Sequence, residues 1–112
     1  MTAPTLSLRI DLGGGPIGPG KIALLEAIAR EGSISAAARA LGMSYRRAWE
    51  LVAELNRALG APVVHAAPGG RSGGGASLTA RGQRIVADYR AIERAALRAA
   101  RARLRRQGEE NG

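Results

Sequence analysis

GSISAAARALGMSYRRAW, residues 32–49, is the stretch that decides how the rest of the chain is interpreted. It predicts two helices, one over about residues 34–41 and one from residue 45 to about residue 59. A serine that can cap the first turn precedes each helix, and a glycine interrupts the chain between them. These punctuating residues are Ser33, Gly42 and Ser44. The two helices should therefore be joined by a tight turn.

Apolar residues recur at helical spacing on one face of each of these helices. The stripe on the first helix comprises Ile34, Ala37, Ala38 and Leu41. The stripe on the second comprises Ala48, Leu51, Val52, Leu55 and Leu59. Because Ala37 and Ala38 are small, the helices can approach closely, and Leu41 and Val52 should fill the space between them. Two short helices joined in this way are typical of the helix-turn-helix motif.

The flanking segments predict further elements. Alternating apolar residues predict one short strand over Thr5–Asp11, and the glycine- and proline-rich segment 13–20 is expected to be irregular. A helix should follow over about Pro19–Glu31. Its buried face should carry Ile22, Leu25, Ile28 and Ala29. Residues 63–67 and 76–78 can pair as a ribbon across the loop GGRSGGG, and such a ribbon would form a wing beside the helices.

Together these elements predict a mainly α fold with a small β wing, that is, a winged helix-turn-helix followed by a long C-terminal helix. Thr79 can cap this last helix, which should run from Ala80 to about Gln107. We expect residues 1–79 to form the winged helix-turn-helix domain with its N-terminal strand. Residues 80–107 should serve as the dimerisation element, and residues 108–112 should form a flexible tail.

Composition narrows the possible functions. The chain has 112 residues, with 17 Lys and Arg against 9 Asp and Glu, so its formal net charge is +8. This surplus favours a polyanionic partner. Because the chain has no cysteine and one histidine, thiol catalysis, a Ser/His/Asp triad and a metal site have almost no candidate residues, and we expect no enzyme activity, metal or cofactor. We see no secretory signal or membrane-spanning stretch, so a cytoplasmic location is expected.

Side chains near the start of the second helix of the motif can read base edges. Arg46 and Arg47 can bind guanine, Glu50 can accept a hydrogen bond from cytosine, and Tyr45 flanks them. Glu50 could instead pair with the neighbouring arginines. We expect Trp49 to be a partly buried anchor rather than a base contact.

Other residues can hold the phosphate backbone of double-stranded DNA. Ser44 lies at the amino end of the same helix, where backbone N–H groups attract anions, and Ser33 and Ser35 lie at the equivalent end of the preceding helix. Arg71 lies among glycines in the predicted wing, so it could reach a phosphate or a narrow minor groove.

The last helix carries a stripe that a partner helix could cover. Its residues recur at spacings of four and three, as in a heptad pattern. They are Ile85, Tyr89, Ile92, Ala96 and Ala99. We therefore predict a two-fold homodimer through this helix.

The chain resembles the amino-terminal winged helix-turn-helix domain of ModE-type molybdate-responsive regulators, which is related to the LysR-type DNA-binding domain. The resemblance lies in GSISAAARALGMSYRRAW, GGRSGGG and ASLTARG and covers about residues 20–89. It implies a dimeric transcription factor, with residues 44–47 at the start of the recognition helix and Arg71 as the basic residue of the wing. ModE-type regulators that sense molybdate carry further oxyanion-binding domains. These 112 residues do not include such domains, so we do not expect molybdate to bind to this chain.

Two other functions fit the same residues. A nonspecific, nucleoid-type or architectural DNA binder would draw most of its affinity from the Arg-rich last helix. A protein-interaction adaptor would keep the fold but would have lost DNA binding.

Overall fold

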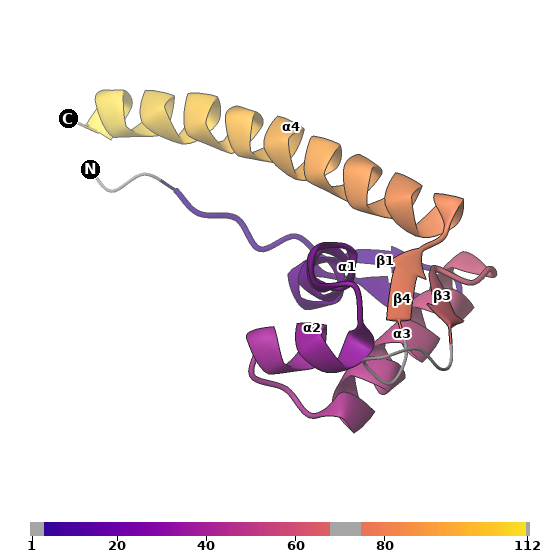
Figure 1. Ribbon diagram of the computed structural model, residues 1–112. Helices are drawn as coiled ribbons and strands as arrows, with labels where there is room; N and C mark the ends of the chain where they lie inside the picture. Colours follow the sequence, from indigo (N-terminus) through magenta and orange to yellow (C-terminus); the bar gives the residue numbers. More distant parts are fainter. Residues whose placement is uncertain (1–3, 68–74, 112) are drawn as a thin grey trace.

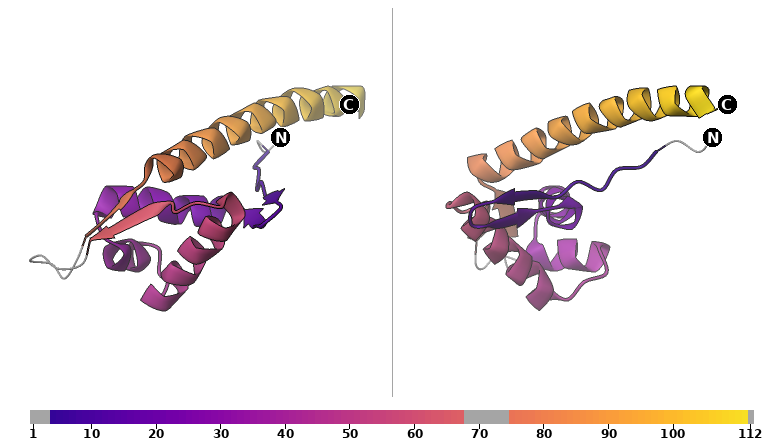
Figure 2. Two further views of the ribbon diagram at one scale, coloured as in Figure 1. Left: turned by 90° about the vertical axis from the view of Figure 1, so that its right-hand side faces the viewer. Right: turned by 180° about the vertical axis from the view of Figure 1, so that it is seen from behind.

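The computed structural model describes residues 4–67 and 75–111. The elements follow in the order β1, β2, α1, α2, α3, β3, β4 and α4 (Figure 1). Three helices and two small hairpins form a body, and a long helix crosses it and extends beyond it (Figure 2). The molecule is therefore elongated, with principal extents of 61 × 28 × 20 Å. The mainly α fold with a β wing and a long last helix is confirmed.

The first hairpin differs from the prediction. β1 covers Ile10–Leu12 and pairs in antiparallel register with β2, Gly15–Ile17. The predicted strand over Thr5–Asp11 is thus wrong in its extent, although alternate residues from 4 to 12 are half-buried as its pattern required. The segment expected to be irregular contains β2, because its last residue, Ile17, is 1% exposed in the core.

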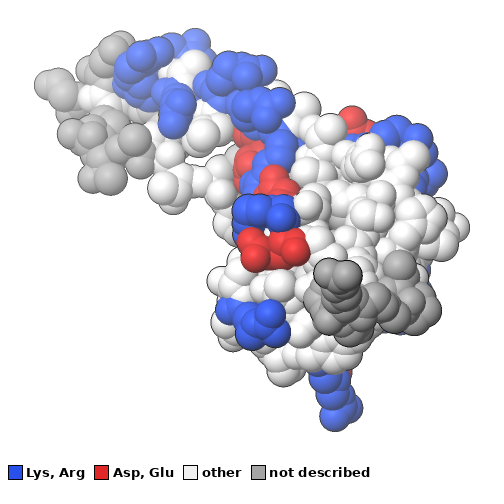
Figure 3. Space-filling model, in the orientation of Figure 1, with Lys and Arg blue, Asp and Glu red and all other residues white. Residues whose placement is uncertain are grey.

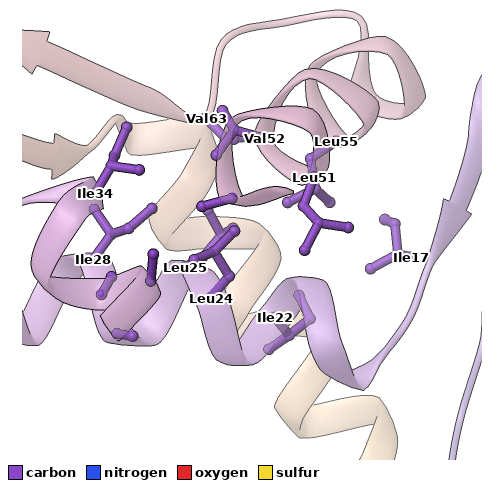
Figure 4. Close-up of a cluster of buried hydrophobic side chains, with 14 of the residues drawn as sticks. Ile17, Ile22, Leu24, Leu25, Ile28, Ile34, Leu51, Val52, Leu55 and Val63 are labelled. Atoms are coloured by element: carbon purple, nitrogen blue, oxygen red, sulfur yellow. The ribbon is translucent and has the colours of Figure 1, made fainter. Parts of the chain in front are cut away.

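Three helices enclose the core of the body. α1 spans Pro19–Glu31, α2 spans Ile34–Ala40 and α3 spans Tyr45–Leu59. Figure 4 shows how their apolar side chains converge with those of the hairpins. The labelled residues are Ile17, Ile22, Leu24, Leu25, Ile28, Ile34, Leu51, Val52, Leu55 and Val63. Of the predicted α1 face, Ala29 is exposed, and Leu24 and Ala27 are buried in addition.

The second hairpin is the predicted wing. β3 covers Val64–Ala67 and pairs antiparallel with β4, Gly75–Leu78. The loop GGRSGGG lies largely outside the described residues. The wing is attached to the body where Ala76 N–H donates to the Gly32 carbonyl at 2.8 Å. The base of the wing is closed by Thr79 N–H, which donates to the Val63 carbonyl at 3.0 Å and continues the β3–β4 pairing.

α4 spans Ala80–Asn111. Thr79 caps it as predicted, because its Oγ1 accepts a hydrogen bond from Gly82 N–H at 3.0 Å. The helix continues four residues past the predicted end at Gln107, so the tail expected to be flexible is helical through Asn111. Its first turns pack on the body, and its later turns extend beyond the body (Figures 1 and 2).

Candidate nucleic-acid interface

α3 is held so that one of its faces must point outward. Ser44 caps it, because Ser44 Oγ accepts a hydrogen bond from Arg47 N–H at 3.0 Å. The four residues buried along its inner face are Ala48, Leu51, Val52 and Leu55. Since this face is fixed in the core, the side chains on the opposite face of the helix are exposed to solvent. The amino-terminal turn of α3 lies at the end of the body remote from α4 (Figure 1).

α2 braces α3 through its small residues. Ala37 and Ala38 are 0% and 2% exposed, which leaves room for the close crossing that the sequence predicted. Ser33 caps α2 by accepting from Ala36 N–H at 3.0 Å. Gly42 has a φ of 68°, a left-handed conformation that favours glycine, and turns the chain toward α3. The helix-turn-helix geometry follows from these contacts.

Leu41 does not fill the space between these helices as predicted. α2 ends at Ala40, and Leu41 becomes its C-cap residue with φ −98° and ψ 3°. The Leu41 residue is consequently 37% exposed. Val52, the other residue expected there, is buried.

The outward face of α3 carries a charged cluster made of Arg46, Arg47 and Glu50. Glu50 pairs with both arginines: its Oε1 lies 3.3 Å from Arg46 Nε and its Oε2 lies 3.2 Å from Arg47 Nη1. The side chain of Arg46 is 90% exposed even in this pair. Exposed ion pairs of this kind contribute at most about 1 kcal/mol, so a nucleic acid can replace them at small cost. The pairing of Glu50 that the sequence left open is therefore present in the free protein.

Beside the charged cluster lies an aromatic pair, Tyr45 and Trp49. Their ring centroids are 6.2 Å apart and their planes meet at 82°, an edge-to-face arrangement. Tyr45 is 55% exposed and Trp49 is 37% exposed. The prediction that Trp49 is a partly buried anchor is therefore wrong, because Trp49 stands exposed with Tyr45 at the outer surface. Trp49 is not among the predicted site residues, although its spacing of four from Tyr45 could have placed both on one side of the helix.

The predicted phosphate contacts fall at helix starts or outside the described residues. Ser33 and Ser44 both serve as caps, and each hydroxyl still has its own O–H to donate. Ser35 is exposed and accepts a hydrogen bond from Arg39 Nη1 at 3.0 Å. Arg71 lies outside the described residues.

The predicted dimerisation stripe of α4 divides into two parts. Ile85 packs against the core of the protomer, and Tyr89 is fully buried there, with its hydroxyl donating to the Leu8 carbonyl at 2.6 Å. Burial in this position raises the pKa of the Tyr89 phenol. Ile92, by contrast, is 47% exposed. Tyr89 therefore belongs to the protomer core and cannot serve a partner helix as predicted.

An ion-pair network fixes α4 against α1. Arg90 reaches Glu26 of α1 with two hydrogen bonds of 2.6 and 3.1 Å, and Glu93 of its own helix at 2.8 Å. The hydrogen bonds from Arg90 hold the pKa of Glu26 below its ordinary value, although desolvation opposes them. The same two carboxylates raise the pKa of Arg90, so it stays charged. The network, together with the buried Tyr89, holds α4 against the body.

Beyond this network, α4 is strongly basic. Arg94, Arg98 and Arg101 are exposed, and no acidic side chain in the described part of the chain pairs with them. Figure 3 shows basic side chains along the far part of α4 and a band of mixed charge where the helix meets the body. Across residues 4–67 and 75–111, no helix has the length and apolar character needed to cross a bilayer.

Comparison with known proteins agrees with the motif. The chain is 56% identical over 80 residues to the molybdenum-pterin-binding protein MopB of Rhodobacter capsulatus, which covers 71% of this chain and 30% of that protein. It is 45% identical over 96 residues to the molybdenum transport protein ModE of Azotobacter vinelandii, and this match covers 83% of this chain and 36% of that protein. It is also 45% identical over 71 residues to the DNA-binding transcriptional dual regulator ModE of Escherichia coli K12, and this match covers 63% of this chain and 27% of that protein.

The chain thus spans 27% to 36% of the length of these relatives. Among solved structures, it resembles the one described as "Crystal structure of CbnR_DBD-DNA complex", with a TM-score of 0.60 and 28% identity over 80% of this chain and 95% of that chain. Residues 20–83 match the family of bacterial regulatory helix-turn-helix proteins of the lysR type. This match covers more than half of the chain and includes α1, α2, α3 and the wing. The chain belongs to the lysR family of bacterial regulatory helix-turn-helix proteins.

Proposed function

We propose that this chain binds double-stranded DNA in a sequence-specific manner as the reading domain of a transcription regulator. The observation that carries the proposal is the exposed surface of α3, where Arg46 and Glu50 stand opposite four buried residues. The exposed side chains of Tyr45, Arg47 and Trp49 flank them. A braced helix of this kind can enter the major groove with its first turns against base edges. The solved DNA complex that the fold resembles supports this assignment.

Each side chain of the charged cluster has a role in this proposal. Arg46, already the most exposed member, binds the O6 and N7 atoms of a guanine. Glu50 either accepts from a cytosine amino group or keeps the guanidinium groups oriented. Ser33, Ser35 and Ser44 bind phosphates together with the N–H groups at the starts of α2 and α3.

We further propose a homodimer that places one α3 in each of two successive major grooves. The part of the predicted stripe that remains available is Ile92, Ala96 and Ala99, which lies beyond the last buried turn of α4. A partner helix over this stripe would remove the exposed Ile92 side chain from water. Arg90 and Glu26, by fixing α4 on α1, would then set the separation of the two reading helices.

The regulated genes are proposed to concern molybdenum. The support is the naming of the relatives, which include a molybdenum transport protein and a molybdenum-pterin-binding protein. The proposal is checked by asking whether fragments of the source genome bound by the chain lie upstream of molybdenum-uptake genes.

The decisive experiment is selection of bound duplexes from a random pool, followed by titration of variants on the selected site. Arg46→Ala and Arg47→Ala should each lose about 1–3 kcal/mol on that site and relax its base preference. Arg71→Ala should weaken binding to all sequences alike. It should also make the slope of the logarithm of the binding constant against the logarithm of the salt concentration shallower by about 0.9. Equal losses on selected and random DNA for all three variants would contradict this division of roles.

A second candidate function rests on the exposed arginines of α4. If Arg94, Arg98 and Arg101 supplied most of the affinity, the chain would be a nonspecific DNA binder. Competition with random duplex separates the two functions. A nonspecific binder loses its labelled DNA to random duplex and selected duplex at the same concentration.

A further inference from the structure

The aromatic pair on α3 is a surface that the charged readout does not use. Of the residues that the structure describes, five large apolar ones are exposed, and two of them are Tyr45 and Trp49 in the first two turns of this helix. In the described part of the chain, no hydrogen bond holds the Tyr45 hydroxyl or the Trp49 indole N–H. Exposing an aromatic pair to water is unfavourable, so a binding role accounts for it better than packing does.

The pair is already arranged for contact. Each ring braces the other in the edge-to-face geometry, with 6.2 Å between centroids, so little side-chain freedom remains to be lost on binding. Residues 45 and 49 also lie one position before Arg46 and Glu50, which places the two strips about 100° apart around the helix. The first turns of α3 therefore carry an apolar strip directly beside a charged one.

The major groove offers one apolar feature to such a strip, the C5-methyl group of thymine. Resting on the proposed function, we propose that Tyr45 and Trp49 are specificity-determining residues that contact thymine methyl groups next to the bases read by the charged cluster. The charged cluster then selects donors and acceptors, whereas the aromatic pair selects a methyl group. The bound site should accordingly contain a thymine at a defined step from its guanine in each half.

The test uses the full chain and the duplex that it selects from a random pool. Each thymidine of that duplex is replaced singly by deoxyuridine, which keeps base pairing and removes the methyl group. For the wild-type chain, replacement at one or two thymines in each half-site should weaken binding by about fourfold for each methyl group that is buried. The remaining thymines should be insensitive.

Variants assign the effect to the two rings. Trp49→Ala and Tyr45→Ala should each become insensitive to loss of the methyl group at the thymine that the removed ring contacts, and the double variant should bind the thymine and uracil duplexes equally well. Tyr45→Phe keeps the ring and should keep the sensitivity. Folding of each variant is followed by circular dichroism, and if Trp49→Ala does not fold, Tyr45→Ala alone makes the comparison, since Tyr45 is 55% exposed.

The outcomes separate this inference from the proposed function. A selected site with no thymine sensitive to the loss of its methyl group would overturn the inference and leave specific binding intact. Sensitivity that persists unchanged in both alanine variants would also overturn it, because another group would then read the methyl. Failure to select any preferred sequence would overturn both proposals.

Discussion

The substitution Gly82→Ala tests whether helix propensity or packing has the larger effect on the stability of the protein at this position. In an exposed helix interior, alanine is favoured over glycine by about 1 kcal/mol. Gly82, however, is buried in the first turns of α4. A Cβ at this position would overlap the carbonyl oxygen of Val63 and also approach Leu78. Helix propensity therefore predicts that Gly82→Ala raises the free energy of unfolding, whereas packing predicts that it lowers it.

The Val63 carbonyl cannot easily move away from an added methyl group. Its oxygen also accepts the Thr79 N–H at 3.0 Å, and the Val63 N–H donates to Asn56 Oδ1 at 2.9 Å. Removing this overlap requires α4 to shift away from the Val63 carbonyl. Overpacking of a closed site costs about 1–3 kcal/mol, and we expect a value near the upper end because the obstacle is backbone. After the propensity gain of about 1 kcal/mol, the net loss of unfolding free energy should be about 2 kcal/mol.

The assay is urea unfolding followed by circular dichroism, with Gly20→Ala as the matched control. Gly20 lies in α1, is exposed, and has no neighbouring heavy atom within 4 Å of the point where an added Cβ would lie. Gly20→Ala should therefore be neutral or slightly stabilising. A loss of about 2 kcal/mol in Gly82→Ala would lower Tm by roughly 8 °C or more. A Gly82→Ala protein at least as stable as wild type would refute the argument from packing.

Three further predictions concern α4. Tyr89→Phe keeps the buried ring but leaves the Leu8 carbonyl without its donor, so the free energy of unfolding should fall by about 1 kcal/mol; unchanged urea unfolding would contradict this. The pKa of Glu26 is lowered in the folded protein, so its contribution to stability is present above its ordinary pKa of 4.5 and is lost as the pH falls below that value. In Glu26→Gln this part of the acid destabilisation should disappear, and a pH profile of unfolding parallel to wild type would argue against the role given to Arg90. Ile92→Asp, at a residue 47% exposed, should convert a dimer to a monomer without lowering monomer stability, and light scattering that finds wild type monomeric at micromolar concentration would exclude the proposed dimer.

The helices of the body could be predicted because their signals are local. Caps, glycines and apolar spacing fixed α1 at the predicted bounds and placed the starts of α2 and α3 correctly. A serine that caps the N–H three residues ahead acts within one turn, and a left-handed glycine ends a helix wherever the helix packs. The outward face of α3 followed from the same spacing, because burying one stripe exposes the other.

The assignments that failed depended on distant residues. The heptad-like spacing in α4 placed Tyr89 in the stripe assigned to a partner helix, but spacing does not say which surface covers a stripe. In the structure, the body of the same protomer covers Tyr89, and the Leu8 carbonyl accepts its hydroxyl hydrogen. Similarly, β2 formed within a Gly/Pro-rich segment because Ile17 is buried in the core.

The amino-acid sequence by itself thus determined the motif, the reading helix and its charged residues, since hydrogen bonds and periodicity within a few residues specify them. Only the tertiary structure decided that Tyr89 is covered by its own protomer, that Gly82 packs against the Val63 carbonyl, and that Arg90 joins α4 to α1. These features arise where separate elements meet, and the free energy of such contacts depends on distances that no local pattern encodes.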